Sequence, residues 1–141
     1  MKTSLVSYKI ASWSLLVIGF GRTITFLTAP NTSEQNELIT TMKALNFNML
    51  GVDANIFSFY TGFSLMMGLL LICYGVINLL MLKNNRQSRL PNNILILNII
   101  ISFFSVVISL KYFFIVPVIF TTIPLIGYLI SLSTRNKNQD L

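Results

Sequence analysis

The stretch that decides the fold runs from Phe57 to Leu82 and reads FSFYTGFSLMMGLLLICYGVINLLML. It carries no charged residue and exceeds the roughly 20 apolar residues that a helix needs to cross the hydrocarbon core of a bilayer. A basic segment and a helix-breaking proline follow it, namely Lys83, Arg86, Arg89 and Pro91. The stretch is therefore predicted to be a membrane-spanning helix, from about 57 to 82.

Three further apolar stretches fit the same description. One precedes it at about 8–28, although a secretory signal peptide is the rival interpretation there, because an apolar core follows a basic start. The apolar pattern resumes after Arg22, which favours a span. The later run is interrupted only by Lys111 and Tyr112 and is too long for one span, so a tight hairpin is expected to divide it into 93–110 and 112–132.

The composition places the whole chain in lipid. Hydrophobic residues make up 54% of the 141 residues and charged residues 10%, and the mean hydropathy is +0.74, which is far too apolar for a soluble domain. The net charge of +6 does not indicate nucleic acid, because the basic residues lie at the ends of apolar runs rather than on one polar face. We expect one domain over 1–141, an all-α four-helix bundle in the membrane.

The basic residues also predict the orientation. Those on one side of the predicted spans outnumber those on the other, Lys43 and Lys111. The more numerous set comprises Lys2, Lys9, Lys83, Arg86, Arg89, Arg135 and Lys137. The positive-inside rule therefore predicts a multi-pass protein of the inner or plasma membrane with both termini in the cytoplasm.

Residue types that carry chemistry are scarce. The chain has no histidine, and Cys73 is its only cysteine, which excludes an intramolecular disulfide, a CxxC redox pair and a multi-cysteine metal site. The carboxylates Glu34, Glu37, Asp53 and Asp140 all lie outside the predicted spans, so none can relay protons or bind a driving cation inside the bilayer. We expect no enzyme activity, no metal and no cofactor.

The connection between the first two spans is expected to contain a short amphipathic helix over about 33–49. Thr32 and Gln35 have the spacing of a capping box, and Gly51 is suited to stop the helix. One face would carry Leu38, Ile39, Met42, Leu45 and Met49. This face either lies in the outer membrane interface or packs on the ends of the spans.

Arg22 is the main candidate for a binding residue, because a charge inside an apolar run is costly. In the structural interpretation it extends to the outer interface or pairs with Glu34, Glu37 or Asp53. In the functional one it faces a cavity between the helices and holds an anionic group. An aromatic cluster begins the second span, where rings form an interfacial belt or line a pocket. The candidate ligand-binding set is Arg22, Asp53, Phe57, Phe59, Tyr60 and Phe63.

Small and polar residues predict helix packing. Gly19, Gly21, Ser58, Gly62, Ser64, Gly68 and Gly75 follow small-residue spacings typical of close helix contacts, within one chain or between two. Asn78 and Asn98 are single polar residues in two spans, and a hydrogen bond between them would satisfy both. Pro117 and Pro124 are both expected to kink the last span.

The segment Phe20–Leu82 resembles a family of small, uncharacterised bacterial four-span membrane proteins. The matching positions are Gly21, Arg22, Phe26, Met42, Phe47, Gly51, Phe57, Phe59, Tyr60, Gly62 and Phe63. Arg22 stands where that family has a histidine, and Ser58 where it has an acidic residue, so a function that needs that pair is altered here. In size and span count the chain is also similar to DoxX-like membrane proteins of quinone and redox pathways.

The sequence leaves three hypotheses for the function. The leading hypothesis is a non-enzymatic protein that binds a lipid-like, quinone-like or other amphiphilic molecule near the outer leaflet, with the loop helix as a lid. The second is a small transporter or channel that works as a homodimer, with Gly62, Gly68 and Gly75 at the contact. The third is an accessory subunit of a larger membrane complex.

Overall fold

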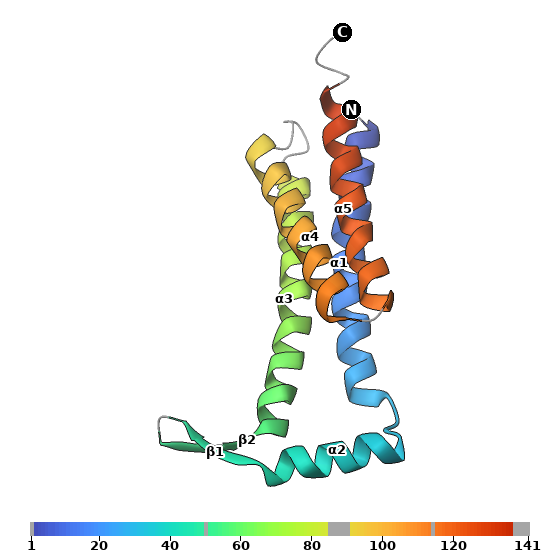
Figure 1. Cartoon of the computed structure of the whole chain (residues 1–141). Coiled ribbons are helices and arrows are strands. Elements are labelled where there is room, and N and C mark those ends of the chain that lie inside the picture. The colour runs from blue at the N-terminus through green and yellow to red at the C-terminus, as the bar shows by residue number, and fades with distance from the viewer. Residues whose placement is uncertain (1, 50, 85–90, 114, 137–141) are drawn as a thin grey trace. The chain divides into compact units, whose positions relative to one another are not determined.

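The computed structural model describes residues 2–49, 51–84, 91–113 and 115–136 (Figure 1). Its elements in chain order are α1 (Lys2–Thr28), α2 (Ser33–Ala44), β1 (Asn46–Met49), β2 (Val52–Asn55), α3 (Ile56–Asn84), α4 (Asn92–Tyr112) and α5 (Ile115–Asn136). Helices α1, α3, α4 and α5 are each long and apolar enough to cross a membrane. The chain is therefore a multi-pass membrane protein of the all-α class, whereas the arrangement of all four spans as one bundle stays a prediction.

The start of α3 and the end of α4 follow from local chemistry. Asn55 caps α3, because its Oδ1 accepts a hydrogen bond of 2.8 Å from the backbone N–H of Ser58. Helix α4 ends where Phe113 adopts an extended conformation, with φ of −122° and ψ of 164°. Helix α4 therefore includes Lys111 and Tyr112, two residues beyond the expected end at 110, and α5 begins at Ile115 instead of at 112.

The prolines of α5 do not act alike. Pro117 lies in the first turn of the helix, where a backbone N–H has no partner inside the helix, so its missing N–H removes no helical bond. Pro124 lies inside the helix and is buried. The prediction that both prolines kink this span is wrong for Pro117, and only Pro124 interrupts the ladder of hydrogen bonds.

The connection after α1 contains a helix and an unpredicted β-hairpin. The capping box of α2 is present: Gln35 N donates to Thr32 Oγ1 over 3.3 Å, and Thr32 N donates to the Gln35 side chain over 2.9 Å. The helix ends at Ala44, five residues before the expected end at Met49. Gly51 does not stop α2. Instead it takes a φ of +82° at the hairpin turn between the antiparallel strands β1 and β2.

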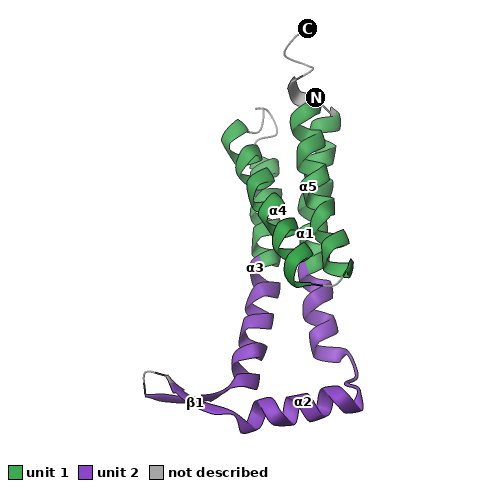
Figure 2. Ribbon diagram, viewed as in Figure 1, with its two compact units in different colours: residues 1–18, 71–141 green, residues 19–70 purple. Residues whose placement is uncertain are grey.

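The described chain divides into two compact units, which Figure 2 distinguishes by colour. Unit 1 comprises residues 1–18 and 71–141, and unit 2 comprises residues 19–70. Unit 1 contains α4, α5, the first part of α1 and the last part of α3. Unit 2 contains the rest of α1 and α3 together with α2 and the hairpin.

The apolar core of unit 1 centres on two tyrosine rings. Tyr8 and Tyr128 are fully buried, and their ring centroids are 5.3 Å apart in an edge arrangement. A Cβ placed on Gly127 would lie only 2.8 Å from the Cβ of Ala11, so the glycine allows α5 to approach α1 closely. Near the start of α1, the hydroxyl of Ser4 donates to the carbonyl of Ser131 over 2.8 Å, and that of Ser131 to the carbonyl of Ser4 over 2.9 Å.

A buried polar network ties α1, α3 and α4 together within unit 1. Asn98 Nδ2 donates to Asn78 Oδ1 over 2.6 Å and to Tyr8 Oη over 3.0 Å. Tyr8 donates to Asn78 Oδ1, and Tyr74 donates to Asn98 Oδ1. The predicted hydrogen bond between the two asparagines is confirmed, and two tyrosine hydroxyls complete the network. Every side chain in it has a partner, as groups in hydrocarbon require.

Candidate functional site

The candidate site lies in unit 2, where α1 and α3 run next to each other. A Cβ on Gly68 of α3 would collide with Thr23 Oγ1 and lie 3.5 Å from the carbonyl oxygen of Gly19. Thr23 Oγ1 donates to that same carbonyl over 2.9 Å. A second contact lies nearer the end of α1, where the ring centroids of Phe26 and Tyr60 are 5.9 Å apart. These two contacts set the register of the helix pair.

Arg22 lies between the two contacts and on the same face of α1. An α-helix turns by about 100° per residue, so Gly19, Arg22 and Phe26 fall within about 60° of one another. Because Gly19 and Phe26 lie on the side of α1 next to α3, Arg22 is placed at the edge of that same face. The side chain is half-buried. At about 1.5 Å per residue, its Cα is about 9 Å from the last residue of α1, Thr28.

The carboxylates expected to pair with Arg22 do not do so. Asp53 lies in β2, where its Oδ1 accepts a hydrogen bond of 2.7 Å from Asn48 Nδ2 across the hairpin. Glu34 and Glu37 lie on α2 and are exposed. Within the described ranges, none of these three side chains forms an ion pair with Arg22. The guanidinium is thus a half-buried cation without a protein countercharge in this part of the chain.

A second unpartnered polar group lies on the facing helix. Thr61 Oγ1 is buried and has no hydrogen-bond partner among the residues that the structure describes. Thr61 precedes Gly68 by seven residues, or about two turns, and therefore shares the face of α3 that meets α1. Sequence reasoning missed this residue, although its seven-residue spacing from Gly68 was a usable signal.

The predicted aromatic wall is divided between two sides of α3. The Nζ of Lys43 lies 5.0 Å from the centroid of the Phe57 ring, a cation–π contact. Tyr60 contacts Phe26. Phe59 instead contacts Phe47 of the hairpin at 6.2 Å and Phe63 at 4.9 Å. By helical spacing, Phe59 and Phe63 lie near the side of α3 opposite Gly68. Only Phe57 and Tyr60 thus share the Arg22 side of the pair.

The small residues also separate into groups. Gly68 and Gly75 meet α1 of the same chain, and a Cβ on Gly75 would lie 2.9 Å from the Leu16 side chain and 3.0 Å from the carbonyl of Ser12. Ser64 is buried. A Cβ on Gly21 or Gly62 would have nothing within 4 Å. The exposed residues are Gly21, Ser58 and Gly62.

The arrangement can hold an anion next to an apolar group. Arg22 offers several N–H donors and a permanent positive charge, and Thr61 offers one hydroxyl. The rings of Phe26, one helical turn after Arg22, and Tyr60, the residue before Thr61, contact each other. A planar cation beside an apolar surface is suited to bind the head group of an anionic amphiphile.

Comparison with protein-family models, with curated proteins and with solved structures finds no match for this chain. The resemblance of residues 20–82 to a bacterial four-span family is therefore not confirmed. The helices themselves support the broader conclusion that this is a small membrane protein with four candidate spans.

Proposed function

We propose that this chain is a non-enzymatic membrane protein that binds an anionic amphiphile between α1 and α3 of unit 2. The observation that carries the proposal is the half-buried Arg22, which lies at the edge of the α1 face next to α3 and lacks a protein countercharge among the described residues. Under the positive-inside rule, this end of α1 faces outward, so the ligand would come from the outer leaflet.

The cost of the charge supports a ligand. An arginine at the centre of a span costs about 2.5–3.5 kcal/mol on insertion scales, and the cost falls towards the interface. A phosphate or carboxylate group offsets this cost with two parallel hydrogen bonds to the planar guanidinium. Arg22 is close enough to the end of α1 for its long side chain to meet a head group at the interface.

The neighbouring side chains fit the rest of an amphiphile. Thr61 supplies a hydroxyl that has no partner among the described residues, and its satisfaction by a polar head group would remove a desolvation cost. Phe26 and Tyr60 supply an apolar wall beside Arg22. The α2 helix and the hairpin would cover this end as a lid.

Native mass spectrometry of the full chain, released from mild detergent, tests the proposal. We expect a retained anionic lipid or other anionic amphiphile in the wild type, and at least a tenfold lower occupancy in Arg22→Gln, because hydrogen bonds to charged groups contribute about 1.5–3 kcal/mol each. Lys111→Gln is the matched control, since it also removes one basic charge. Unchanged occupancy in a folded Arg22→Gln protein would show that the proposal is wrong.

A homodimeric transporter or channel remains the second candidate, favoured by one observation. Ser58 and Gly62 are both exposed and lie four residues apart, and Gly62 has open space where a Cβ would stand. This pattern suits a close contact with a second copy. Because Gly68 and Gly75 already contact α1, the dimer contact would rest on Ser58 and Gly62. Subunit counting in bilayers tests it, and dissociation by Gly62→Leu is the expected result.

A further inference from the structure

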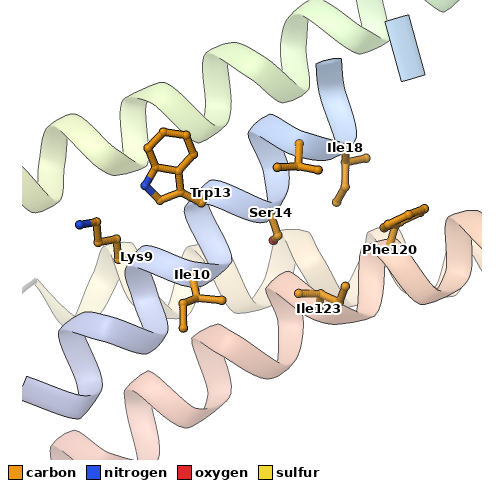
Figure 3. A pocket seen from close by; sticks show the side chains of 8 residues that line it. Lys9, Ile10, Trp13, Ser14, Ile18, Phe120 and Ile123 are labelled. Atoms are coloured by element: carbon orange, nitrogen blue, oxygen red, sulfur yellow. The ribbon is translucent and has the colours of Figure 1, made fainter. Parts of the chain in front are cut away.

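A groove with a volume of about 460 Å³ lies between α1 and α5 in unit 1. Figure 3 shows Ile10 and Ile18 on α1, with Phe120 and Ile123 on α5. The volume is within the range of about 300–1,000 Å³ that is usual for small-molecule sites. The lining is almost entirely apolar, and the groove is open along one side.

The groove runs alongside the close contact between the two helices and extends beyond it. At Gly127, α5 approaches Ala11 so closely that a Cβ would lie 2.8 Å from the Ala11 side chain. One turn earlier α5 carries Ile123, and about one further turn away it carries Phe120. These larger side chains replace the glycine contact with an open apolar channel.

Lys9 is the one charged residue among the described residues that line the groove. It lies inside the candidate span Thr3–Thr28, about 9 Å from Thr3 at about 1.5 Å per residue. In the sequence of unit 1, residues 1–18 and 71–141, the only acidic residue is Asp140, which lies outside the described residues. The described part of unit 1 therefore has no carboxylate that could neutralise Lys9.

Along α1, the residues that line the groove change from charged to apolar, in the same order as the head group and acyl chain of a phospholipid. Lys9 is followed one turn later by Trp13, a residue type common at head-group depth, and a further turn later by Val17. The hydroxyl of Ser14, also in the lining, donates to the carbonyl of Ala11 over 2.7 Å. The groove beyond Trp13 thus presents no free polar donor and matches a hydrocarbon chain.

We infer that this groove binds one anionic glycerophospholipid, with its phosphate at Lys9 and one acyl chain between α1 and α5. A second copy of the chain fits less well, because a twofold contact through the groove would bring two Lys9 side chains together without an acid between them. The site uses residues of unit 1 alone and does not depend on the proposed role of Arg22.

The test measures lipid binding to the full chain by native mass spectrometry, with phosphatidylglycerol and phosphatidylcholine of the same acyl chains. All variants carry Arg22→Gln, so that the proposed site in unit 2 does not contribute. We expect about a fivefold preference for phosphatidylglycerol, since one basic residue near an anionic lipid surface contributes about 1 kcal/mol. Lys9→Gln should abolish the preference, whereas Lys111→Gln should keep it.

A second variant tests the groove itself. Val17→Trp fills the channel and is expected to reduce the binding of both lipids, whereas Leu97→Trp, at an exposed position of α4 outside the groove, should not. A phosphatidylglycerol preference that survives Lys9→Gln would overturn the inference. So would a wild-type dimer that Val17→Trp converts to a monomer, because the groove would then hold a second copy.

Discussion

The buried amides of unit 1 and the polar groups between α1 and α3 of unit 2 differ in whether they have partners. In unit 1, Asn78 and Asn98 are fully buried, yet tyrosine hydroxyls and amides satisfy each other in a closed network. In unit 2, Arg22 has no carboxylate partner and Thr61 Oγ1 has no hydrogen bond within the described residues. Tyr128 Oη of unit 1 is also buried without a hydrogen-bond partner among the described residues, but it lies in the packed core. The satisfied amides join helices, whereas under the proposed function Arg22 and Thr61 would bind a ligand.

The largest loss of unfolding free energy is expected from Asn98→Ala, at the centre of the unit 1 network. Asn98→Ala removes three side-chain hydrogen bonds and leaves Tyr8, Tyr74 and Asn78 short of partners. At about 0.6 kcal/mol for an average interhelical bond in a membrane, the loss is about 2 kcal/mol of unfolding free energy. Equilibrium unfolding in micelles measures it.

Asn93→Ala, at an exposed position near the start of α4, is the matched control. If both alanine variants unfold at the same denaturant concentration, the network does not stabilise unit 1.

The next comparison is between Gly127 of unit 1, where an added Cβ has no room, and Gly62 of unit 2, where it has room. Gly127→Ala forces a Cβ to within 2.8 Å of Ala11 and 3.1 Å of the carbonyl of Ser7, and overpacking of this kind costs about 1 kcal/mol or more. Gly62→Ala meets nothing within 4 Å and should stabilise the helix by up to about 1 kcal/mol. Unfolding midpoints should therefore move in opposite directions, and a shift in the same direction would contradict the packing described here.

The smallest effect compares the removal of one hydroxyl from each unit. Tyr8→Phe deletes a hydroxyl that bonds Asn78 and Asn98, and it should destabilise the protein by about 0.5–1.5 kcal/mol. Thr61→Val deletes a hydroxyl without a partner in the described structure, so the ligand-free protein should be unchanged or slightly more stable. Thermal unfolding in detergent measures both, and a Thr61→Val protein less stable than Tyr8→Phe would reverse the comparison.

The spans and one interior contact were predictable from sequence. Hydrophobic length alone located α1, α3, α4 and α5, because a span must be long and uninterrupted. The Asn78–Asn98 bond was predictable because an isolated amide in hydrocarbon needs a partner. Tyr8 and Tyr74 were missed because tyrosine also occurs in spans without a buried hydrogen bond.

The candidate site was less predictable. Which face of α3 meets α1 is set by Gly68 and its contact with Thr23, so the sequence did not reveal that Phe59 and Phe63 lie on the far side. The end of α2 was also misplaced, because Asp53 pairs with Asn48 in a hairpin that competes with the helical pattern. Pairing between strands depends on both segments together, and a helical spacing in one segment does not report it.

The most direct test of the account is a titration of the full chain with phosphatidylglycerol, with the unfolding free energy measured in parallel. Wild-type Arg22 and Arg22→Gln are compared, both carrying Lys9→Gln so that the groove of unit 1 contributes no charge preference. The account predicts at least a tenfold loss of affinity on Arg22→Gln, with unfolding changed by less than about 0.5 kcal/mol. Unchanged affinity together with a clear loss of stability would show that Arg22 is a structural residue and would contradict the account.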